Sequence, residues 1–222
     1  MTEFNAARSN MIESQVRPNG ITDRRIIAAM EQIAREDFVP DSRRAIAYVD
    51  EDVPLSPSDA SRGPRALIEV MAFARMLQNV AIKPVDKVLV VGAGTGYGAA
   101  VVSALAGKVF ALECDPGLAA QAQHNLSGLS NVSVYEGSLE AGLKGEQPFD
   151  VIIVEGRVGE VPKGLLDQLG HEGRLVAVVG ETEMAQACVH TKSGAAVAVR
   201  KAFDASVAAL PGFRKVKPAF VF

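Results

Sequence analysis

The sequence predicts an α/β domain whose core is a doubly wound, mostly parallel sheet. Five short apolar runs between residues 87 and 180 lack the strict alternation of half-exposed strands, which is typical of strands covered on both faces. Stretches of helical composition separate these runs and are long enough to form right-handed crossovers. The first run ends in VLVVGAGTGYG, residues 88–98, where glycines open the backbone at the place that receives a nucleotide in such sheets.

The first eighty residues differ from the remainder and are expected to form a helical cap. ITDRRIIAAMEQIA, which begins at residue 21, has four apolar side chains at helical spacing behind a candidate N-cap, Thr22 or Asp23. A second helix is expected to start near Pro64 and to run through ALIEVMAFARMLQNV, with an apolar stripe typical of a core-facing helix. We therefore assign residues 1–80 to a cap and substrate segment and residues 81–222 to a nucleotide-binding domain, as parts of one structural unit.

The remaining elements alternate along the chain. The predicted strands are KVLVVG (87–92), KVFALE (108–113), VSVYEG (132–137), FDVIIVEG (149–156) and RLVAVVG (174–180). The predicted helices between them are GYGAAVVSALAG (96–107), PGLAAQAQHNLSGL (116–129) and PKGLLDQLG (162–170). In the tail, QACVHTKS and AAVAVRKAF have the pattern of a hairpin, which we expect to close one edge of the sheet with antiparallel strands.

Composition excludes several classes of function. The 222 residues carry 23 basic and 26 acidic side chains, a net charge of −3, which gives no electrostatic footprint for nucleic acid or an anionic membrane. No apolar stretch reaches the roughly 20 residues needed to cross a bilayer, and the N-terminus lacks the apolar centre of a signal peptide, so a cytoplasmic location is expected. The two cysteines, Cys114 and Cys188, lie far apart without ligand spacing, so the sequence predicts neither a metal site nor a disulfide framework.

The glycine turn can receive either a dinucleotide or S-adenosylmethionine. Read from Gly92, the dinucleotide pattern G-x-G-x-x-G requires glycine at position 97, where the chain has Tyr97; read from Gly94, it ends in Ala99. Glu113 ends the next predicted strand, 21 positions after Gly92, where a carboxylate can accept hydrogen bonds from both ribose hydroxyls of either ligand. Tyr97, together with the lack of a proton-transfer residue in a motif, disfavours a nicotinamide-dependent oxidoreductase.

Longer segments of the chain resemble class I S-adenosylmethionine-dependent methyltransferases, which have a Rossmann-like fold. The resemblance rests on VLVVGAGTGYGAAV, VFALECDP, VSVYEGSLEAG, FDVIIVEG and LLDQLGHEGRLVAVVG, in this order and spacing. The N-terminal segment MIESQVRPNGITDRRIIAAMEQIAREDFVP is similar to that of protein-L-isoaspartate O-methyltransferases in its order of Q-x-R, G-I-x-D and F-V-P. The resemblance covers about residues 8–180 and implies a protein-repair enzyme that transfers a methyl group from S-adenosylmethionine to a carboxylate of a peptide or protein, leaving S-adenosylhomocysteine.

The resemblance also implies a set of cofactor-binding residues. The glycine turn would line the methionine and ribose, Glu113 would hold the ribose hydroxyls, and the residues after the third strand would lie beside the adenine. By their positions in the family's motifs, these residues are Gly92, Ala93, Gly94, Gly96, Tyr97, Glu113, Cys114, Ser138 and Leu139. The family has G-D-G where this chain has Gly137-Ser138-Leu139, so the Ser138 hydroxyl replaces an anionic acceptor for the adenine amine.

The substrate-binding segment departs further from the family. The family has T-I-S-Q-P before the second helix, with a hydroxyl near the substrate carboxylate, whereas this chain has SDASRGP at residues 58–64. Ser61 is the catalytic candidate if Gly63 is an insertion; aligned on Pro64, the same position is Arg62. Arg62 and Arg65 are candidates for binding an anionic substrate through bidentate carboxylate contacts.

A second departure from the family's sequence leaves more than one alternative for the methyl acceptor. The family's small-residue loop after its fourth strand is here Glu155-Gly156-Arg157-Val158. Two alternatives to an isoaspartyl methyltransferase therefore remain, a homologue with a different acceptor and a non-catalytic module that binds S-adenosylmethionine.

Overall fold

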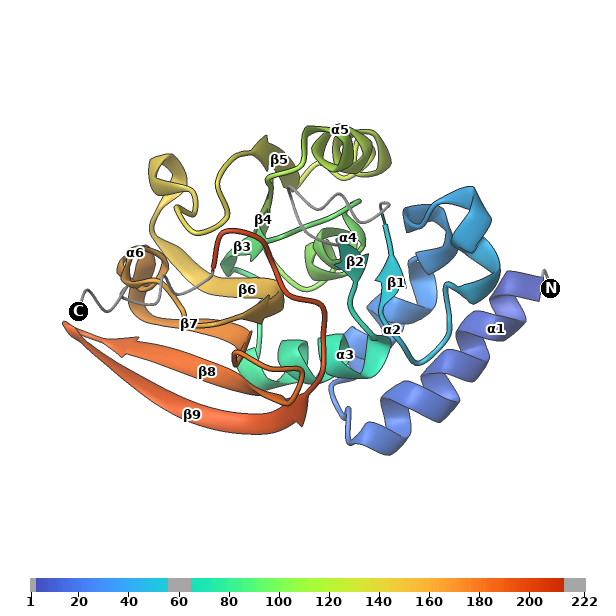
Figure 1. Ribbon diagram of the computed structural model, residues 1–222, viewed down its shortest axis with the longest axis horizontal. Helices are drawn as coiled ribbons and strands as arrows, with labels where there is room; N and C mark the ends of the chain where they lie inside the picture. The colour runs from blue at the N-terminus through green and yellow to red at the C-terminus, as the bar shows by residue number, and fades with distance from the viewer. Residues whose placement is uncertain (1–2, 56–64, 214–222) are drawn as a thin grey trace, which may run out of the picture.

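Seven strands form one sheet in the part of the chain that the structure describes, residues 3–55 and 65–213 (Figure 1). In this computed structural model the strand order is β5-β4-β3-β6-β7-β8-β9. Strands β3 to β7 are parallel, β8 is antiparallel to β7, and β9 is antiparallel to β8. This arrangement confirms the predicted mostly parallel sheet with an antiparallel edge. The strands are β3 (Lys87–Val91), β4 (Lys108–Glu113), β5 (Val132–Glu136), β6 (Phe149–Val158), β7 (Leu169–Val179), β8 (Ala185–Ser193) and β9 (Ala196–Ala205).

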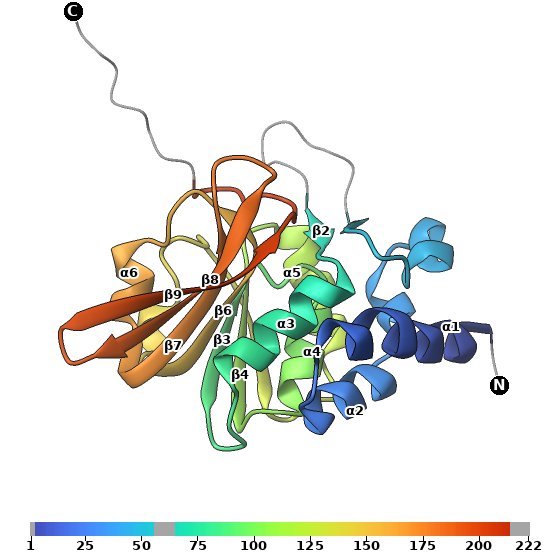
Figure 2. The same cartoon turned by 90° about the horizontal axis from the view of Figure 1, so that it is seen from below.

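Burial on both faces explains why the central strands do not alternate in polarity. In β3, Val88 and Val90 belong to one apolar core, and Leu89 and Val91 belong to a second. The first core contains side chains of α3, α4 and α5, and the second contains those of α6. Figure 2 shows α6 on the opposite side of the sheet from α3 and α4. These helices are α3 (Val70–Val80), α4 (Tyr97–Ser103), α5 (Pro116–Asn125) and α6 (Lys163–Asp167).

The helix expected from Pro64 begins later in the chain, at Val70. Before it, β2 (Ala66–Leu67) pairs antiparallel with β1 (Val53–Pro54). The Leu55 N–H also donates a hydrogen bond to the Arg65 carbonyl oxygen at 2.8 Å. The predicted helix start was wrong because the apolar spacing of the helix also includes Leu67. The backbone at this position pairs with residues 53–55 and so is not helical. We call residues 53–55 and 65–67 the β1–β2 ribbon.

The N-terminal cap begins with α1 (Glu3–Met11), a π-helical turn (Ile12–Val16) and α2 (Arg24–Gln32). Asp23 is the N-cap of α2, as one of the two predicted candidates, and its Oδ1 accepts a hydrogen bond from the Arg25 N–H at 2.9 Å. Helix α1 is not among the predicted helices, because it buries only Met11 and so has little apolar periodicity.

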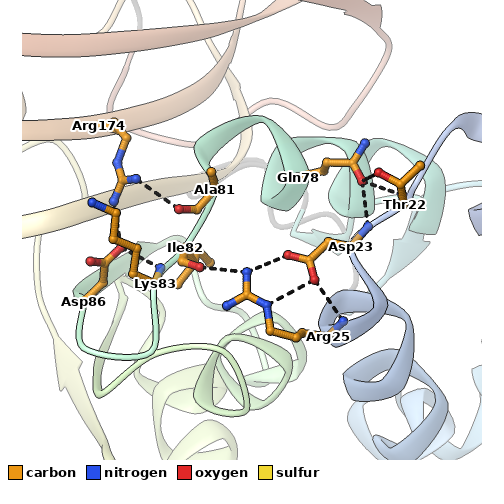
Figure 3. Close-up of polar contacts among 9 residues, drawn as sticks. All are labelled: Thr22, Asp23, Arg25, Gln78, Ala81, Ile82, Lys83, Asp86 and Arg174. Carbon is orange, nitrogen blue, oxygen red and sulfur yellow. Dashed lines mark hydrogen bonds and ion pairs between the residues drawn. The ribbon is translucent and has the colours of Figure 1, made fainter.

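Polar contacts join these first helices of the cap to α3 (Figure 3). Gln78 Oε1 accepts hydrogen bonds from the backbone N–H groups of Thr22 and Asp23, at 2.6 and 3.2 Å. Arg25 Nη2 donates to the Ile82 carbonyl oxygen at 3.1 Å. The start of α2 is thereby held against the end of α3.

A second group of contacts in Figure 3 lies at the amino end of β3. Arg174 of β7 donates to the Ala81 carbonyl oxygen at 3.0 Å and pairs with the Asp86 carboxylate at 2.7 Å. Asp86 directly precedes β3, so this pair lies at the opposite end of the strand from the glycine turn.

One apolar core continues from the cap through α3 into the sheet. It contains Met30 of α2, Phe73 of α3 and Val101 of α4, all of them buried. The core has no break at the boundary expected between residues 80 and 81, and the division into two parts stays a prediction. Among the described helices, none has the length and apolar character needed to cross a membrane.

Candidate cofactor and methyl-transfer site

The strand order reverses between β3 and β6, and the glycine turn lies at this point. Strands β4 and β5 lie on one side of β3, and the chain then returns to place β6 on the other side. Ligands of such sheets bind outside the carboxyl ends of the strands at the reversal. Gly92, Gly94 and Gly96 follow β3 with φ angles of +81°, +56° and +100°, which other residues rarely adopt. These three positions require glycine for conformational reasons, and Ala93 between them is buried.

Glu113 ends β4 and turns its carboxylate toward the glycine turn. Its Oε2 accepts a hydrogen bond from the Gly94 N–H at 2.7 Å, and its Oε1 accepts from the N–H groups of Cys114 and Asp115 at 2.9 and 3.1 Å. Arg65 donates to both carboxylate oxygens, with Nε 3.2 Å from Oε1. The side chains of this ion pair are 3% and 0% exposed. Burial alone raises the pKa of Glu113, but the hydrogen bonds and charge of Arg65, with the backbone N–H groups, bring it below its ordinary value.

Side chains from distant parts of the chain lie against Gly92 and Gly94 of the glycine turn. A β-carbon on Gly94 would lie 2.7 Å from Leu55 Cδ1. One on Gly92 would lie 2.9 Å from Leu210 Cδ2 and 3.4 Å from Arg65 Nη2. Leu55 and Arg65 come from the β1–β2 ribbon, and Leu210 comes from the segment after β9 that runs beside β6 (Figure 1). The atoms nearest to these two glycines are therefore side-chain ends and not backbone atoms.

A second buried carboxyl group, Glu155 of β6, lies next to the start of α4. A β-carbon on Gly98 would overlap Glu155 Oε1, so glycine at this position leaves room for the carboxyl group. Glu155 is 6% exposed, and its Oε1 has no hydrogen-bond partner among the described residues. Burial raises the pKa of Glu155 to about 8, against the opposing charges of Arg65 and Arg35. The sequence prediction did not include Glu155 among the site residues. The available signal was an acidic residue in a loop where the family has small residues.

Tyr97 begins α4, as predicted, and its ring is buried against the cap. The ring centroid lies 5.7 Å from that of Phe38 and 6.0 Å from that of Phe73. The Arg35 guanidinium lies 4.8 Å from the same ring. In the structure Tyr97 therefore packs between α4 and the cap, and its predicted contact with a cofactor stays a prediction.

The remaining predicted residues lie near Glu113, after β5, or outside the described residues. Cys114 is half-buried beside Glu113, and burial raises the pKa of its thiol to about 11. After β5, Ser138 is exposed and Leu139 is buried in the second core. Ser61 and Arg62 lie outside the described residues. Within residues 3–55 and 65–213, no group of three or more His, Cys, Asp or Glu side chains is placed to hold a metal ion.

The residues at the glycine turn have the chemical properties needed to bind an adenosyl cofactor. The Glu113 carboxylate can accept hydrogen bonds from a ribose diol, and the glycine turn lets a ligand approach the backbone. Leu55, Arg65 and Leu210 lie within 3.4 Å of the positions that β-carbons on Gly94 or Gly92 would occupy.

The sequence matches a known protein family over most of its length. A family model described as protein-L-isoaspartate(D-aspartate) O-methyltransferase matches residues 6–211. A protein-L-isoaspartate O-methyltransferase of Koribacter versatilis (strain Ellin345) is 38% identical over 221 residues, which cover 99% of this chain and 97% of the relative. A protein of the same name from Methanoculleus marisnigri is 38% identical over 178 residues, 79% of this chain and 78% of the relative.

Solved structures share the fold. A protein-L-isoaspartate O-methyltransferase structure matches with a TM-score of 0.79 at 24% identity, over 92% of this chain and 66% of that chain. A Plasmodium falciparum structure in complex with S-adenosyl-L-homocysteine matches with a TM-score of 0.75 at 19% identity, over 95% of this chain and 99% of that chain.

Proposed function

Because the chain belongs to the protein-L-isoaspartate(D-aspartate) O-methyltransferase family, and is thus an S-adenosylmethionine-dependent O-methyltransferase, we propose that it methylates the free carboxylate of isoaspartyl residues in peptides or proteins. We assign the reaction to the carboxyl ends of β3, β4 and β6, and the contact of Glu113 with the glycine turn supports this assignment. A cytoplasmic location, expected from the sequence, is part of this proposal.

The position of Glu113 is the observation that carries the proposal. Its carboxylate ends the strand next to β3 and bonds to the Gly94 N–H, so a hydrogen-bond acceptor and an open backbone turn lie side by side. An adenosyl group needs both features at this place in the sheet. Core packing does not account for them, because burying a carboxylate costs stability that an apolar side chain would not.

Methylation of a carboxylate does not require the protein to transfer a proton. When bound, the cofactor would supply a sulfonium methyl group: a carboxylate oxygen of the acceptor would bond to the methyl carbon as the carbon–sulfur bond breaks, leaving S-adenosylhomocysteine as a neutral thioether. An acceptor carboxylate with a pKa of roughly 4 is already ionised at neutral pH, so no general base is required. The chain's residues have to align the acceptor and to exclude water. The buried glycine turn, with Leu55 and Leu210 over it, supplies a water-excluding wall.

The substrate side of the site is assigned to Ser61 and Arg62, which lie outside the described residues. We assign the Ser61 hydroxyl to orientation of the acceptor and the Arg62 guanidinium to binding of its carboxylate. Ser61→Ala should then lower kcat more than cofactor affinity, and Arg62→Ala should raise KM. Full activity of Ser61→Ala would favour the alignment in which Arg62 takes the serine position.

A methyl-transfer assay tests the proposed substrate. The purified protein is incubated with methyl-labelled S-adenosylmethionine and either an isoaspartyl peptide or the aspartyl peptide of the same sequence. We expect label in the isoaspartyl peptide only. Tight cofactor binding by calorimetry without any transfer to the isoaspartyl peptide would refute the proposed acceptor. A different acceptor or a non-catalytic binding module would then be the remaining interpretations.

A further inference from the structure

Two acidic residues lie on opposite sides of the glycine turn at the same level of the sheet. Val91, the last residue of β3, is in register with Leu112 of β4 and with Val154 of β6. The residues that follow these two partners are Glu113 and Glu155, so both acids are level with the first glycine of the turn. Neighbouring strands lie about 4.8 Å apart, which places the two α-carbons about 10 Å from each other.

Both acids also point to the same face of the sheet. Ala111 of β4 and Ile153 of β6 belong to the core that contains side chains of α3 and α4. Side chains alternate between the two faces along a strand, so Glu113 and Glu155 continue the rows of these residues. For Glu155 the overlap with a β-carbon on Gly98 confirms the direction, because Gly98 lies in the first turn of α4. The two carboxyl groups therefore flank the glycine turn on the side of α4.

The two carboxyl groups differ in their hydrogen bonds. Glu113 accepts from Arg65 and from backbone N–H groups, including that of Gly94. Glu155 is 6% exposed, and its Oε1 accepts no hydrogen bond from any residue in the ranges 3–55 and 65–213. Burying an acceptor without a donor costs free energy that an apolar side chain at this position would avoid. Core packing therefore does not account for Glu155.

The ionisable groups near Glu155 do not supply the missing donor. Arg65 of the β1–β2 ribbon and Arg35 of the cap favour the Glu155 anion, and Glu113 opposes it. Arg65 bonds to both oxygens of Glu113, and Arg35 donates to two backbone carbonyl oxygens at 2.8 and 2.9 Å. Tyr97 of α4 is a further neighbour, and burial raises its pKa, so it stays neutral near pH 7.

An adenosyl cofactor carries such a donor at one end. S-adenosylmethionine and S-adenosylhomocysteine both consist of adenosine joined through sulfur to an amino-acid part that bears an ammonium group. With the ribose at Glu113 and the adenine toward β5, the amino-acid part would extend the other way across the turn, toward β6 and Glu155. An ammonium group donates hydrogen bonds, whereas the sulfonium carries charge but no N–H or O–H. Of the two cations, only the ammonium matches an acceptor that lacks a donor.

We propose that the Glu155 carboxylate binds the ammonium group of the cofactor's amino-acid part, on the opposite side of the glycine turn from Glu113. The inference rests on the proposed function in placing the cofactor at this turn, and it is independent of the methyl acceptor. Without an ammonium partner, burial keeps the carboxyl group of Glu155 mainly protonated near pH 7. Its proton therefore passes to solvent when the ammonium pairs with it.

Isothermal titration calorimetry with two ligands tests the assignment. The ligands are S-adenosylhomocysteine and its deaminated analogue, in which hydrogen replaces the amino group. At pH 8, Glu155→Gln should weaken binding of S-adenosylhomocysteine by about tenfold or more, because a neutral acceptor replaces a charged one, and should change the affinity for the analogue by less than about twofold. Glu155→Met removes the acceptor and should weaken binding of S-adenosylhomocysteine further.

Two control variants separate this effect from general damage to the site or the fold. Glu113→Gln changes the acid on the other side of the turn, where the proposed contact is with the ribose that both ligands share, so it should weaken both by the same factor. Arg174→Met breaks the Arg174–Asp86 pair at the far end of β3 and should lower Tm without changing either affinity.

The pH dependence gives a readout that a purely structural role of Glu155 would not change. In the wild type, the affinity for S-adenosylhomocysteine relative to that for the analogue should rise between pH 6.5 and pH 8. The reason is that Glu155 has to ionise to pair with the ammonium, and its pKa is about 8. In Glu155→Gln this ratio should not change with pH. Groups that affect both ligands alike cancel in the ratio.

Several results would overturn the inference. They are an equal effect of Glu155→Gln on both ligands, no effect on either, weaker binding of S-adenosylmethionine but not of S-adenosylhomocysteine, a change confined to the KM for a peptide, and no binding of either ligand by the wild type. Unchanged binding of both ligands by Glu113→Gln would remove the cofactor from the turn and overturn the inference with it. Selectivity for the amino group that depends on Glu155, without transfer to an isoaspartyl peptide, would support the inference and refute only the proposed acceptor.

Discussion

Replacing the ionisable carboxyl group of Glu155 by an amide should stabilise the fold, and the effect should grow as pH rises. Glu155 has a pKa of about 8 in the folded protein, because burial disfavours its anion, against an ordinary value of 4.5. Below pH 4.5 the carboxyl group is protonated in both states and contributes no difference. Between pH 4.5 and 8 the unfolded chain ionises and the folded protein does not, so the wild type loses stability as pH rises. At 1.36 kcal/mol per pH unit, the loss reaches about 5 kcal/mol by pH 8. A glutamine side chain has nearly the same shape as glutamate and cannot ionise. The Glu155→Gln variant should therefore not lose stability as pH rises.

Urea unfolding of the wild type and of Glu155→Gln at pH 5 and pH 8 measures the effect. The free energy of unfolding of the variant should exceed that of the wild type by less than about 1 kcal/mol at pH 5 and by several kcal/mol at pH 8. Glu183→Gln, at an exposed position, is the matched control and should give a small difference at both pH values. A difference that does not change with pH, or that favours the wild type at pH 8, would refute the assignment of a buried neutral carboxyl group to Glu155.

Three further predictions concern the cofactor turn and the cap. Glu113→Ala should weaken S-adenosylmethionine binding by about 1 to 3 kcal/mol in calorimetry, the scale of a lost charge-assisted hydrogen-bond partner, and an unchanged Kd would remove Glu113 from the site. Gly94→Val should abolish binding with the fold retained by circular dichroism, because its β-carbon would lie 2.7 Å from Leu55 Cδ1 at a φ of +56° that branched residues rarely adopt. Normal binding by this variant would make the turn purely structural. Asp23→Ala should lower the free energy of unfolding by about 1 kcal/mol through loss of the α2 N-cap, while cofactor affinity stays unchanged; a change in affinity instead of stability would contradict a purely structural cap.

The sequence by itself determined the sheet and the meeting of the glycine turn with Glu113, because both depend on short-range patterns. Strands such as β3 are buried on both faces, which leaves a continuous apolar run that can be recognised without knowing its neighbours. Gly92, Gly94 and Gly96 are recognisable because positive φ angles select glycine. Glu113 follows at the end of the next strand, and parallel strands bring their carboxyl ends to the same edge. The contact between Glu113 and the glycine turn was therefore predictable from adjacent motifs, and the binding of a cofactor by these residues stays a prediction.

Only the tertiary structure decided which groups meet these residues. Arg65 and Glu113 form an ion pair although they lie 48 positions apart in sequence. Pairing within the β1–β2 ribbon likewise explains why α3 begins at Val70 and not near Pro64, as the sequence predicts. The environment of Glu155 likewise depends on segments far from it, since its carboxyl group fits the space at Gly98 and lies near Arg65 and Arg35. The physical reason is that periodicity and backbone preference act over a few residues. Burial, ion pairing and the pKa of a buried acid depend on partners that folding alone brings into contact.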